Sequence, residues 1–341
     1  RNVALGDTAL DSVEAGGTDN TAIGNEALTA NTTSDKNTSI GSRSAVATTT
    51  GSQNTVVGAC AFYTNTTGDS NVALGYEALK ANTSGACNVA VGHRSLIANT
   101  TGKPNTAVGM CSLNANTTGA DNTAVGYQSL DSNTTGSCNV AVGKTALSTA
   151  TTASYNTAVG MRAMFLTTTG NKNVAVGTSA MQCNTTGSNN TAVGGMDANA
   201  FPTMFANTTG SNNTAIGNST LICNTTANNN TAVGFESSKL NTTGADNSTF
   251  GYRALCANTT ATENNAFGYE ALRGNTTGCR NTAMGFQAGT AVTTGDENTF
   301  IGRKAGLGVT TTDNQTAIGS FALSASVTGA NNTAVGKSAL A

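Results

Sequence analysis

The sequence has no tryptophan, two prolines and one histidine, and only 10% of its 341 residues are charged and 5% aromatic. So few bulky side chains exclude the thick core of an ordinary globular domain. With 38% hydrophobic residues and a net charge of −2, the chain is also too apolar and too weakly charged for a simple disordered protein. It has no excess of basic residues that would attract nucleic acid, and no apolar run near the ~18 residues of a membrane-spanning helix. We therefore expect no nucleic-acid partner and no membrane insertion.

Motifs for catalysis and metal binding are missing as well. The stretches GKT at 143–145 and GKS at 336–338 lack the earlier glycine that a phosphate-binding loop requires. There is no Cys-x-x-Cys pair to indicate zinc, and carboxylates do not recur as an acid/base pair. We expect no enzyme, no metal and no cofactor.

What the sequence does contain is one repeat, present in 20 copies. Its anchor is Asn-x-[Ala/Ser]-apolar-Gly, from Asn2 to Asn332, and each step is 17 residues except one of 18 and one of 23. Counting from the anchor Asn as position 1, position 4 is apolar, position 5 is Gly, position 8 is mostly Ala or Ser and position 9 is usually Leu. Positions 12–15 often read NTTG. A strict period over the whole chain is typical of a solenoid.

The residue types favour β-structure over helix. Recurrent glycine and β-branched residues oppose a helix, and NTTG is typical of turns. Seventeen residues suffice for two short strands and two turns, and stacked coils about 4.8 Å apart pair their backbones. Alternation places positions 2 and 4 on one face and positions 3 and 5 on the other. We predict an all-β fold, a β-solenoid (β-roll) of about 20 coils, with positions 4 and 9 as its core and a bare Ala/Gly face.

The glycine and the anchor asparagine each have an expected role. The glycine takes a positive φ, or lies where another backbone comes close, and the asparagines form an amide ladder. The whole chain, 1–341, is expected to be one repeat domain and a segment of a longer or processed protein. A six-residue insertion near 195–207 is expected to protrude as a loop that includes Phe201, Pro202, Met204 and Phe205.

Three stretches carry a family resemblance: NTAVGYQSL at 122–130, NVAVGKTAL at 139–147 and NTAIGNEAL at 20–28. They resemble the head repeats of trimeric autotransporter adhesins of the YadA type. They resemble even more the NTALGYQAL–NTTG repeats of phage-type tail fibres and related bacterial fibre proteins. The resemblance implies a β-roll in a parallel homotrimer or other homo-oligomer, with the Ala/Gly face against neighbouring chains. It also implies a structural fibre, filament or adhesive shaft that is extracellular, on a cell or virion surface.

Two features keep a binding module open as the alternative function. Position 6 is aromatic in four successive coils, at Phe235, Tyr252, Tyr269 and Phe286. These rings suit a platform for surface carbohydrate, or else stack on one another. Flat rows of threonine suggest ice binding.

Glycosylation sequons recur at position 12 of the repeat. An exposed turn would accept N-glycans, and these are the only covalently attached groups that we expect. Asn and Thr also suit turns that carry no sugar. The candidate sites are Asn31, Asn65, Asn82, Asn99, Asn116, Asn133, Asn184, Asn207, Asn224, Asn241, Asn258 and Asn275.

Four of the eight cysteines are regularly spaced. Cys60 and Cys87 are 27 residues apart, as are Cys111 and Cys138, and the two pairs are offset by three coils. Cys60 and Cys111 occupy position 7 of the repeat, and Cys87 and Cys138 occupy position 17. These two positions lie at opposite ends of a flattened coil, too far apart for a disulfide within one chain. Disulfides between neighbouring protomers, in an oxidising extracellular setting, and free thiols both fit this spacing.

Overall fold

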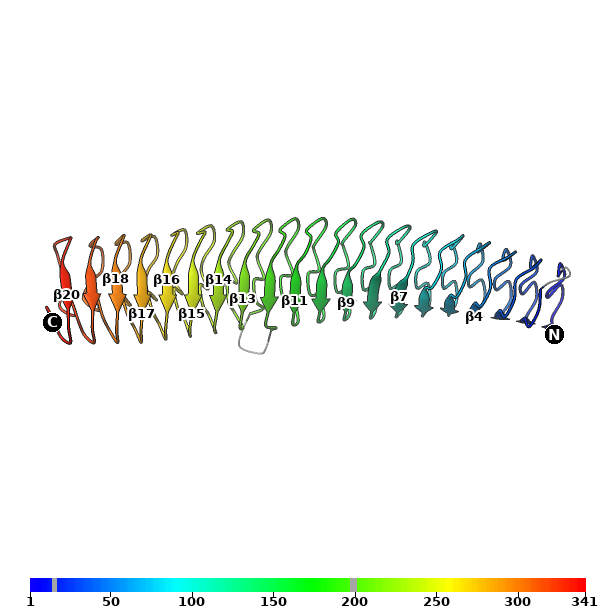
Figure 1. The fold of residues 1–341 in the computed structure, drawn as a ribbon, viewed down its shortest axis with the longest axis horizontal. Coiled ribbons are helices and arrows are strands. Elements are labelled where there is room, and N and C mark those ends of the chain that lie inside the picture. Colours follow the sequence, from blue (N-terminus) through cyan, green and yellow to red (C-terminus); the bar gives the residue numbers. More distant parts are fainter. Residues whose placement is uncertain (14–16, 197–200) are drawn as a thin grey trace. The chain divides into compact units, whose positions relative to one another are not determined.

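The computed structural model describes residues 1–13, 17–196 and 201–341 (Figure 1). In these ranges the regular structure is entirely β, with a strand after each anchor. The prediction of an all-β solenoid is confirmed. The prediction of two strands per coil is wrong, because the rest of each coil consists of turns and bends in the described residues. The chain divides into two compact units, Arg1–Asn171 and Lys172–Ala341.

Each unit contains ten short parallel strands. Those of the first unit are β1 (Val3–Leu5), β2 (Thr21–Ile23), β3 (Thr38–Ile40), β4 (Thr55–Val57), β5 (Val72–Leu74), β6 (Val89–Val91), β7 (Asn105–Val108), β8 (Asn122–Val125), β9 (Val140–Val142) and β10 (Thr157–Val159). Those of the second unit are β11 (Val174–Val176), β12 (Thr191–Val193), β13 (Thr214–Ile216), β14 (Thr231–Val233), β15 (Ser248–Phe250), β16 (Asn265–Phe267), β17 (Thr282–Met284), β18 (Thr299–Ile301), β19 (Thr316–Ile318) and β20 (Thr333–Val335).

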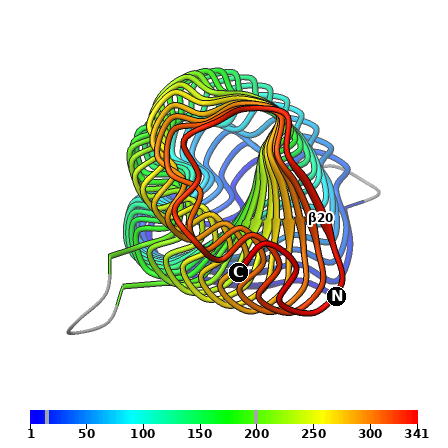
Figure 2. The ribbon, with the colours of Figure 1, turned by 90° about the vertical axis from the view of Figure 1, so that its left-hand side faces the viewer.

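Within each unit, strands pair in chain order and like positions lie opposite one another. Ala124 of β8 pairs with Ala141 of β9. The register survives the 23-residue step, where Ala192 of β12 pairs with Ala215 of β13. Successive coils of a unit therefore lie almost on top of one another (Figure 2).

Hydrogen bonds between coils continue beyond the strands. In the NTTG turn, the Thr117 N–H donates to the Thr134 carbonyl at 2.9 Å. Before that turn, the Leu113 N–H donates to the Ser129 carbonyl at 3.0 Å. Strand and turn groups of one coil thus find partners on the next, so a coil depends on its neighbours for its backbone hydrogen bonds.

The glycine at position 5 lies at a corner where coils touch. Gly126 has φ 133°, a conformation that L residues rarely adopt, and a Cβ there would lie 2.7 Å from the carbonyl carbon and oxygen of Gly143. Both expected roles of this glycine are therefore confirmed.

The core differs from the prediction at one position. Leu130 at position 9 is fully buried, as expected, but Val125 at position 4 is 36% exposed and Ala124 at position 3 is fully buried. The prediction of a core at position 4 is therefore wrong. The anchor Asn122 is 1% exposed, and strand alternation then turns position 3 inward and positions 2 and 4 outward.

Two buried asparagine ladders line the interior. At position 1, the Asn122 N–H and Nδ2 donate to Asn105 Oδ1 at 3.0 and 3.2 Å, and Nδ2 also donates to the Gly136 carbonyl at 2.9 Å. At position 12, Asn116 Nδ2 donates to Asn99 Oδ1 at 2.9 Å and to the Gly119 carbonyl at 3.0 Å. The predicted anchor ladder is confirmed, and the second ladder was not predicted.

Exceptions in the core are compensated locally. Phe300 occupies position 3, where most coils have Ala, and is fully buried. Position 9 of its own coil and of the preceding coil is glycine, Gly306 and Gly289. A Cβ on Gly289 would lie 2.6 Å from Phe300 Cδ2, and a Cβ on Gly306 would clash with the same ring. The ring of Phe300 thus occupies space that the position-9 side chains of these two coils would otherwise need.

The predicted insertion follows Gly194, and residues 197–200 of it lie outside the described residues. Phe201 is 61% exposed, whereas Met204 is fully buried. Met204 takes the place of the usual position-9 leucine, Pro202 is also buried and Phe205 is half-buried. The assignment of Pro202 and Met204 to a protruding loop is therefore wrong. The additional residues fall between positions 5 and 8 of this coil.

Candidate interaction surface

The strands of each unit present a continuous row of outward side chains, the outward face, made of positions 2 and 4. In the first unit, Leu74 and Val125 at position 4 are 39% and 36% exposed. In the second, Ile216 and Ile318 are 40% and 38% exposed. No repeat has a charged residue at either position. The predicted Ala/Gly contact face is wrong, because the alanines point into the core.

The aromatic residues of position 6 form a stacked column in the second unit. Ring centroids lie 5.6 Å apart for Phe235–Tyr252, 5.1 Å for Tyr252–Tyr269 and 5.1 Å for Tyr269–Phe286, with interplanar angles of 8–12°. The stacking interpretation is confirmed. Each inner ring lies between two neighbouring rings, so its faces are less accessible than its edges, and the four side chains are 39–44% exposed. A sugar platform needs exposed faces, which this column has only at its two ends.

Ion pairs flank this column at positions 7 and 10. Lys239 Nζ lies 2.7 Å from Glu236 Oε1, Arg253 Nε 3.0 Å from Glu236 Oε2, and Arg273 Nη1 3.5 Å from Glu270 Oε1. These side chains neutralise one another and leave little net charge beside the rings.

Two acidic residues of the first unit lie in contrasting surroundings. The hydrogen bond from Lys80 holds the pKa of Glu77 below its ordinary value, and the same contact raises the pKa of Lys80. Burial raises the pKa of Asp131. The Oδ1 atoms of Asp131 and of Asn114, one coil earlier, have no hydrogen-bond partner among the described residues.

The sequon asparagines of position 12 are buried, contrary to the prediction of an exposed turn. Asn116 and Asn133 are both fully buried, and the Asn133 Nδ2 donates to Asn116 Oδ1 and to the Gly136 carbonyl. A glycan on Nδ2 would break the ladder and would need space that the core does not have. The same burial applies to the whole set: Asn31, Asn65, Asn82, Asn99, Asn116, Asn133, Asn184, Asn207, Asn224, Asn241, Asn258 and Asn275.

Threonines of the same turn are on the outside instead. Thr118 at position 14 is exposed, and Thr117 at position 13 donates its hydroxyl to the Thr134 carbonyl at 3.0 Å. The exposed row at position 14 is almost unbroken: Thr33, Thr50, Thr67, Ser84, Thr101, Thr118, Thr135, Thr152, Thr169, Thr186, Thr209, Thr226, Thr243, Thr260, Thr277, Thr294, Thr311 and Thr328.

All eight cysteines lie in the described ranges, and each is a free thiol within this chain. Cys87 is exposed, and Cys60, Cys111 and Cys138 are partly exposed. Bonding between protomers therefore stays a prediction for these four thiols.

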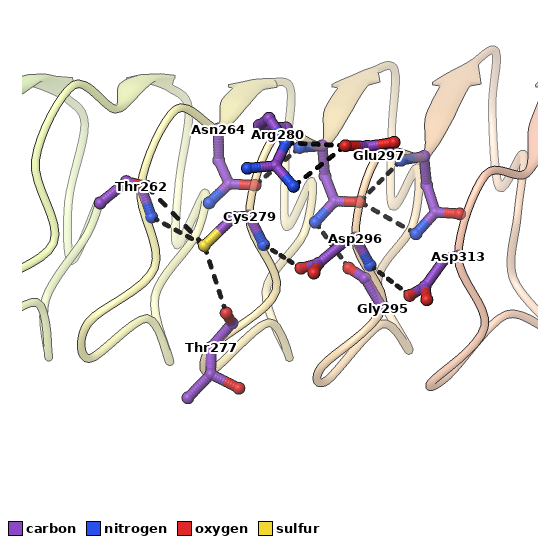
Figure 3. A network of polar contacts seen from close by, with 11 residues as sticks. Thr262, Asn264, Thr277, Cys279, Arg280, Gly295, Asp296, Glu297 and Asp313 are labelled. Carbon is purple, nitrogen blue, oxygen red and sulfur yellow. Dashed lines mark hydrogen bonds and ion pairs between the residues drawn. The ribbon is translucent and has the colours of Figure 1, made fainter.

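Cys279 shows what a thiol does at position 16 (Figure 3). Its Sγ accepts the Thr262 N–H at 3.4 Å, and its own N–H donates to Asp296 Oδ1 at 2.7 Å. The Asp296 N–H in turn donates to Asp313 Oδ1 at 2.8 Å. Short polar side chains at this position thus accept the amide of the preceding coil, and Cys279 fills the role that aspartate fills nearby.

Other site types find no support in the described ranges. They contain no group of three or more His, Cys, Asp or Glu side chains that could hold a metal. No helix there is long and apolar enough to cross a membrane. No protein-family model matches the chain, and no curated protein matches it.

Proposed function

We propose that the chain is a structural subunit of an extracellular fibre or filament, and that it assembles with further copies of itself through the outward face. The observation that carries this proposal is the row of apolar side chains at position 4, exposed or half-buried on the outward face, which no charge interrupts. Monomeric soluble proteins rarely expose continuous apolar patches larger than a few hundred Å², and such patches mark interaction sites.

The interior suits a mechanical role. Each coil is tied to the next through strand, turn and asparagine hydrogen bonds, so stiffness comes from the repetition itself. A fibre subunit of this kind supplies length, rigidity and a regular surface for display, and it needs no catalytic centre.

The surface location and the parallel trimer rest on the resemblance to adhesin heads and tail fibres. Disulfides between protomers through Cys60, Cys87, Cys111 and Cys138 would fit an oxidising setting. Non-reducing electrophoresis tests them: reducible bands of higher mass would support the bonds, and monomer bands alone would exclude them.

Imaging by cryo-electron microscopy, with sedimentation velocity over a concentration series, tests the assembly. We expect side-by-side assemblies of solenoids whose fraction grows with concentration. Single solenoids at every concentration would exclude a self-assembling fibre.

A second candidate function is binding to an ordered surface such as ice. The exposed threonine row of position 14, held in register by the turn hydrogen bonds, is the observation that favours it. Thermal hysteresis of the purified chain is the test, and its absence at high concentration would remove this candidate.

A further inference from the structure

The second unit has two stacked columns of partly exposed aromatic residues, one at position 4 on the outward face and one at position 6 beyond the corner glycine. Phe250 and Phe267 at position 4 stack with centroids 5.0 Å apart and an interplanar angle of 10°. In each coil, position 6 follows position 4 by two residues, with the corner glycine between them. We call these two columns together the aromatic patch: Phe235, Phe250, Tyr252, Phe267, Tyr269 and Phe286.

The patch is large enough to anchor an interface. Phe250, Tyr252 and Tyr269 are 38%, 40% and 44% exposed. Each exposed ring residue therefore offers about 80 Å² and the half-buried Phe267 less, so the six rings alone offer roughly 450 Å² before their neighbours Met284 and Ile301 are added. Two such patches in contact would bury about 1,000 Å², the lower limit for a specific protein interface.

No charge within the patch opposes contact between like surfaces. Position 2 beside the Phe250–Phe267 stack carries the neutral Ser248 and Asn265. On the other side, Glu236 and Arg253 pair with each other. An aromatic centre with a polar, internally neutralised border is the usual composition of an interface hot spot.

The ring spacing favours a second copy over other occupants. Ring centroids recur every 5.0–5.6 Å along the two columns, so the exposed ring edges form a regularly spaced surface. Ring edges of another copy have the same spacing and pack against this surface in register, as identical side chains do between paired sheets. A sugar would instead need the ring faces, which are less accessible than the edges.

We propose that a second copy of this chain docks on the aromatic patch, so that patch meets patch; the proposal rests on the self-assembly proposed above. The patch then fixes which coils of the two chains lie opposite each other, because elsewhere the outward face repeats non-aromatic apolar side chains at position 4 and mostly threonine or valine at position 2.

The test replaces the patch by residues that the repeat itself uses at these positions. Phe250→Val, Phe267→Val, Tyr252→Asn and Tyr269→Asn are combined, because Val125 and Asn25 occupy positions 4 and 6 in other coils. The matched control carries Tyr76→Asn and Tyr127→Asn, two position-6 aromatics of the first unit. Sedimentation equilibrium should show self-association at least tenfold weaker in the patch variant and less than threefold weaker in the control. Circular dichroism should show an unchanged fold in both.

Each result decides one question. If the patch variant associates as strongly as the wild type, the docking site is overturned and the fibre proposal stands. A wild-type chain that stays monomeric would remove both. A photo-crosslinking residue in place of Tyr252 should join this position to patch peptides of another copy, and crosslinks confined to other coils would contradict the proposal. Glycan-array binding that the variant loses, with its association intact, would assign the patch to carbohydrate instead.

Discussion

At the scale of single residues, several departures from the repeat in the core are matched by a neighbour. Position 3 is alanine in most coils, and the buried exceptions have partners nearby. Ser39 Oγ lies 2.6 Å from Ser44 Oγ, and Ser237 Oγ donates to Thr249 Oγ1 at 2.8 Å. Phe300 is the apolar counterpart, with Gly289 and Gly306 beside it.

Phe300→Ala should lower the free energy of unfolding by about 3–5 kcal/mol, because two glycines cannot fill the cavity. Gly306→Leu alone should also destabilise the chain by steric clash with the ring. The triple variant Phe300→Ala, Gly289→Leu, Gly306→Leu restores the usual residues and should recover most of the loss. Urea unfolding of the three variants measures this coupling, and purely additive losses would contradict the compensation.

Asp131→Asn should stabilise the chain at neutral pH. Burial raises the pKa of Asp131 in the folded state. The protonated carboxyl group therefore contributes stability that is fully present below the unfolded-state pKa and is lost as the pH rises through the folded-state pKa. The variant should therefore unfold at higher urea than wild type at pH 7 and at equal urea in acid. Asp121→Asn, at an exposed aspartate, is the control and should change little at either pH. A gain from Asp131→Asn that is the same in acid would refute the burial argument.

At the scale of the coil, the sequence predicts the period, the β class, the corner glycine and the anchor ladder, because each depends on a strict repeat. It did not predict which strand face is packed. The hydrophobicity of Val125 favours a place in the core, whereas the buried hydrogen bonds of Asn122 determine which side chains of the strand point inward. A usable signal was side-chain size: position 4 admits residues from Val to Phe250, while position 3 is held to small residues with few exceptions.

The prediction that the sequon asparagines are exposed was wrong for a similar reason. An Asn-Thr-Thr-Gly turn looks solvated in sequence, but stacking makes the Asn side chain a link between coils. The feature of the sequence that indicates a buried ladder is the recurrence of Asn in many copies of position 12, which is more frequent than a turn requires.

Asn116→Ala should destabilise the chain by about 2–4 kcal/mol, since it removes two donated hydrogen bonds and leaves Asn133 Nδ2 without its Asn116 acceptor. Thr118→Ala, two residues away and exposed, is the matched control and should cost less than about 0.5 kcal/mol. Thermal unfolding followed by circular dichroism compares the two, and equal small effects would mean that the ladder contributes little.

At the scale of the whole molecule, the account depends on what covers the outward face. A solenoid with Ala and Asn inside and Val, Ile and Thr outside places much of its exposed apolar area where another solenoid could bury it. The same arrangement explains the lack of charge at positions 2 and 4, since an unpaired charge there would be costly to bury in an interface.

The most direct test of this account places charge on the outward face of the first unit. The variant Val108→Lys, Val125→Glu, Val142→Lys alternates sign along three neighbouring coils, so the charges attract rather than repel within one chain. We predict an unchanged circular dichroism spectrum and melting temperature, together with at least tenfold weaker self-association in sedimentation equilibrium. Wild-type association in this variant, or loss of its fold as expected for a core position, would contradict the account.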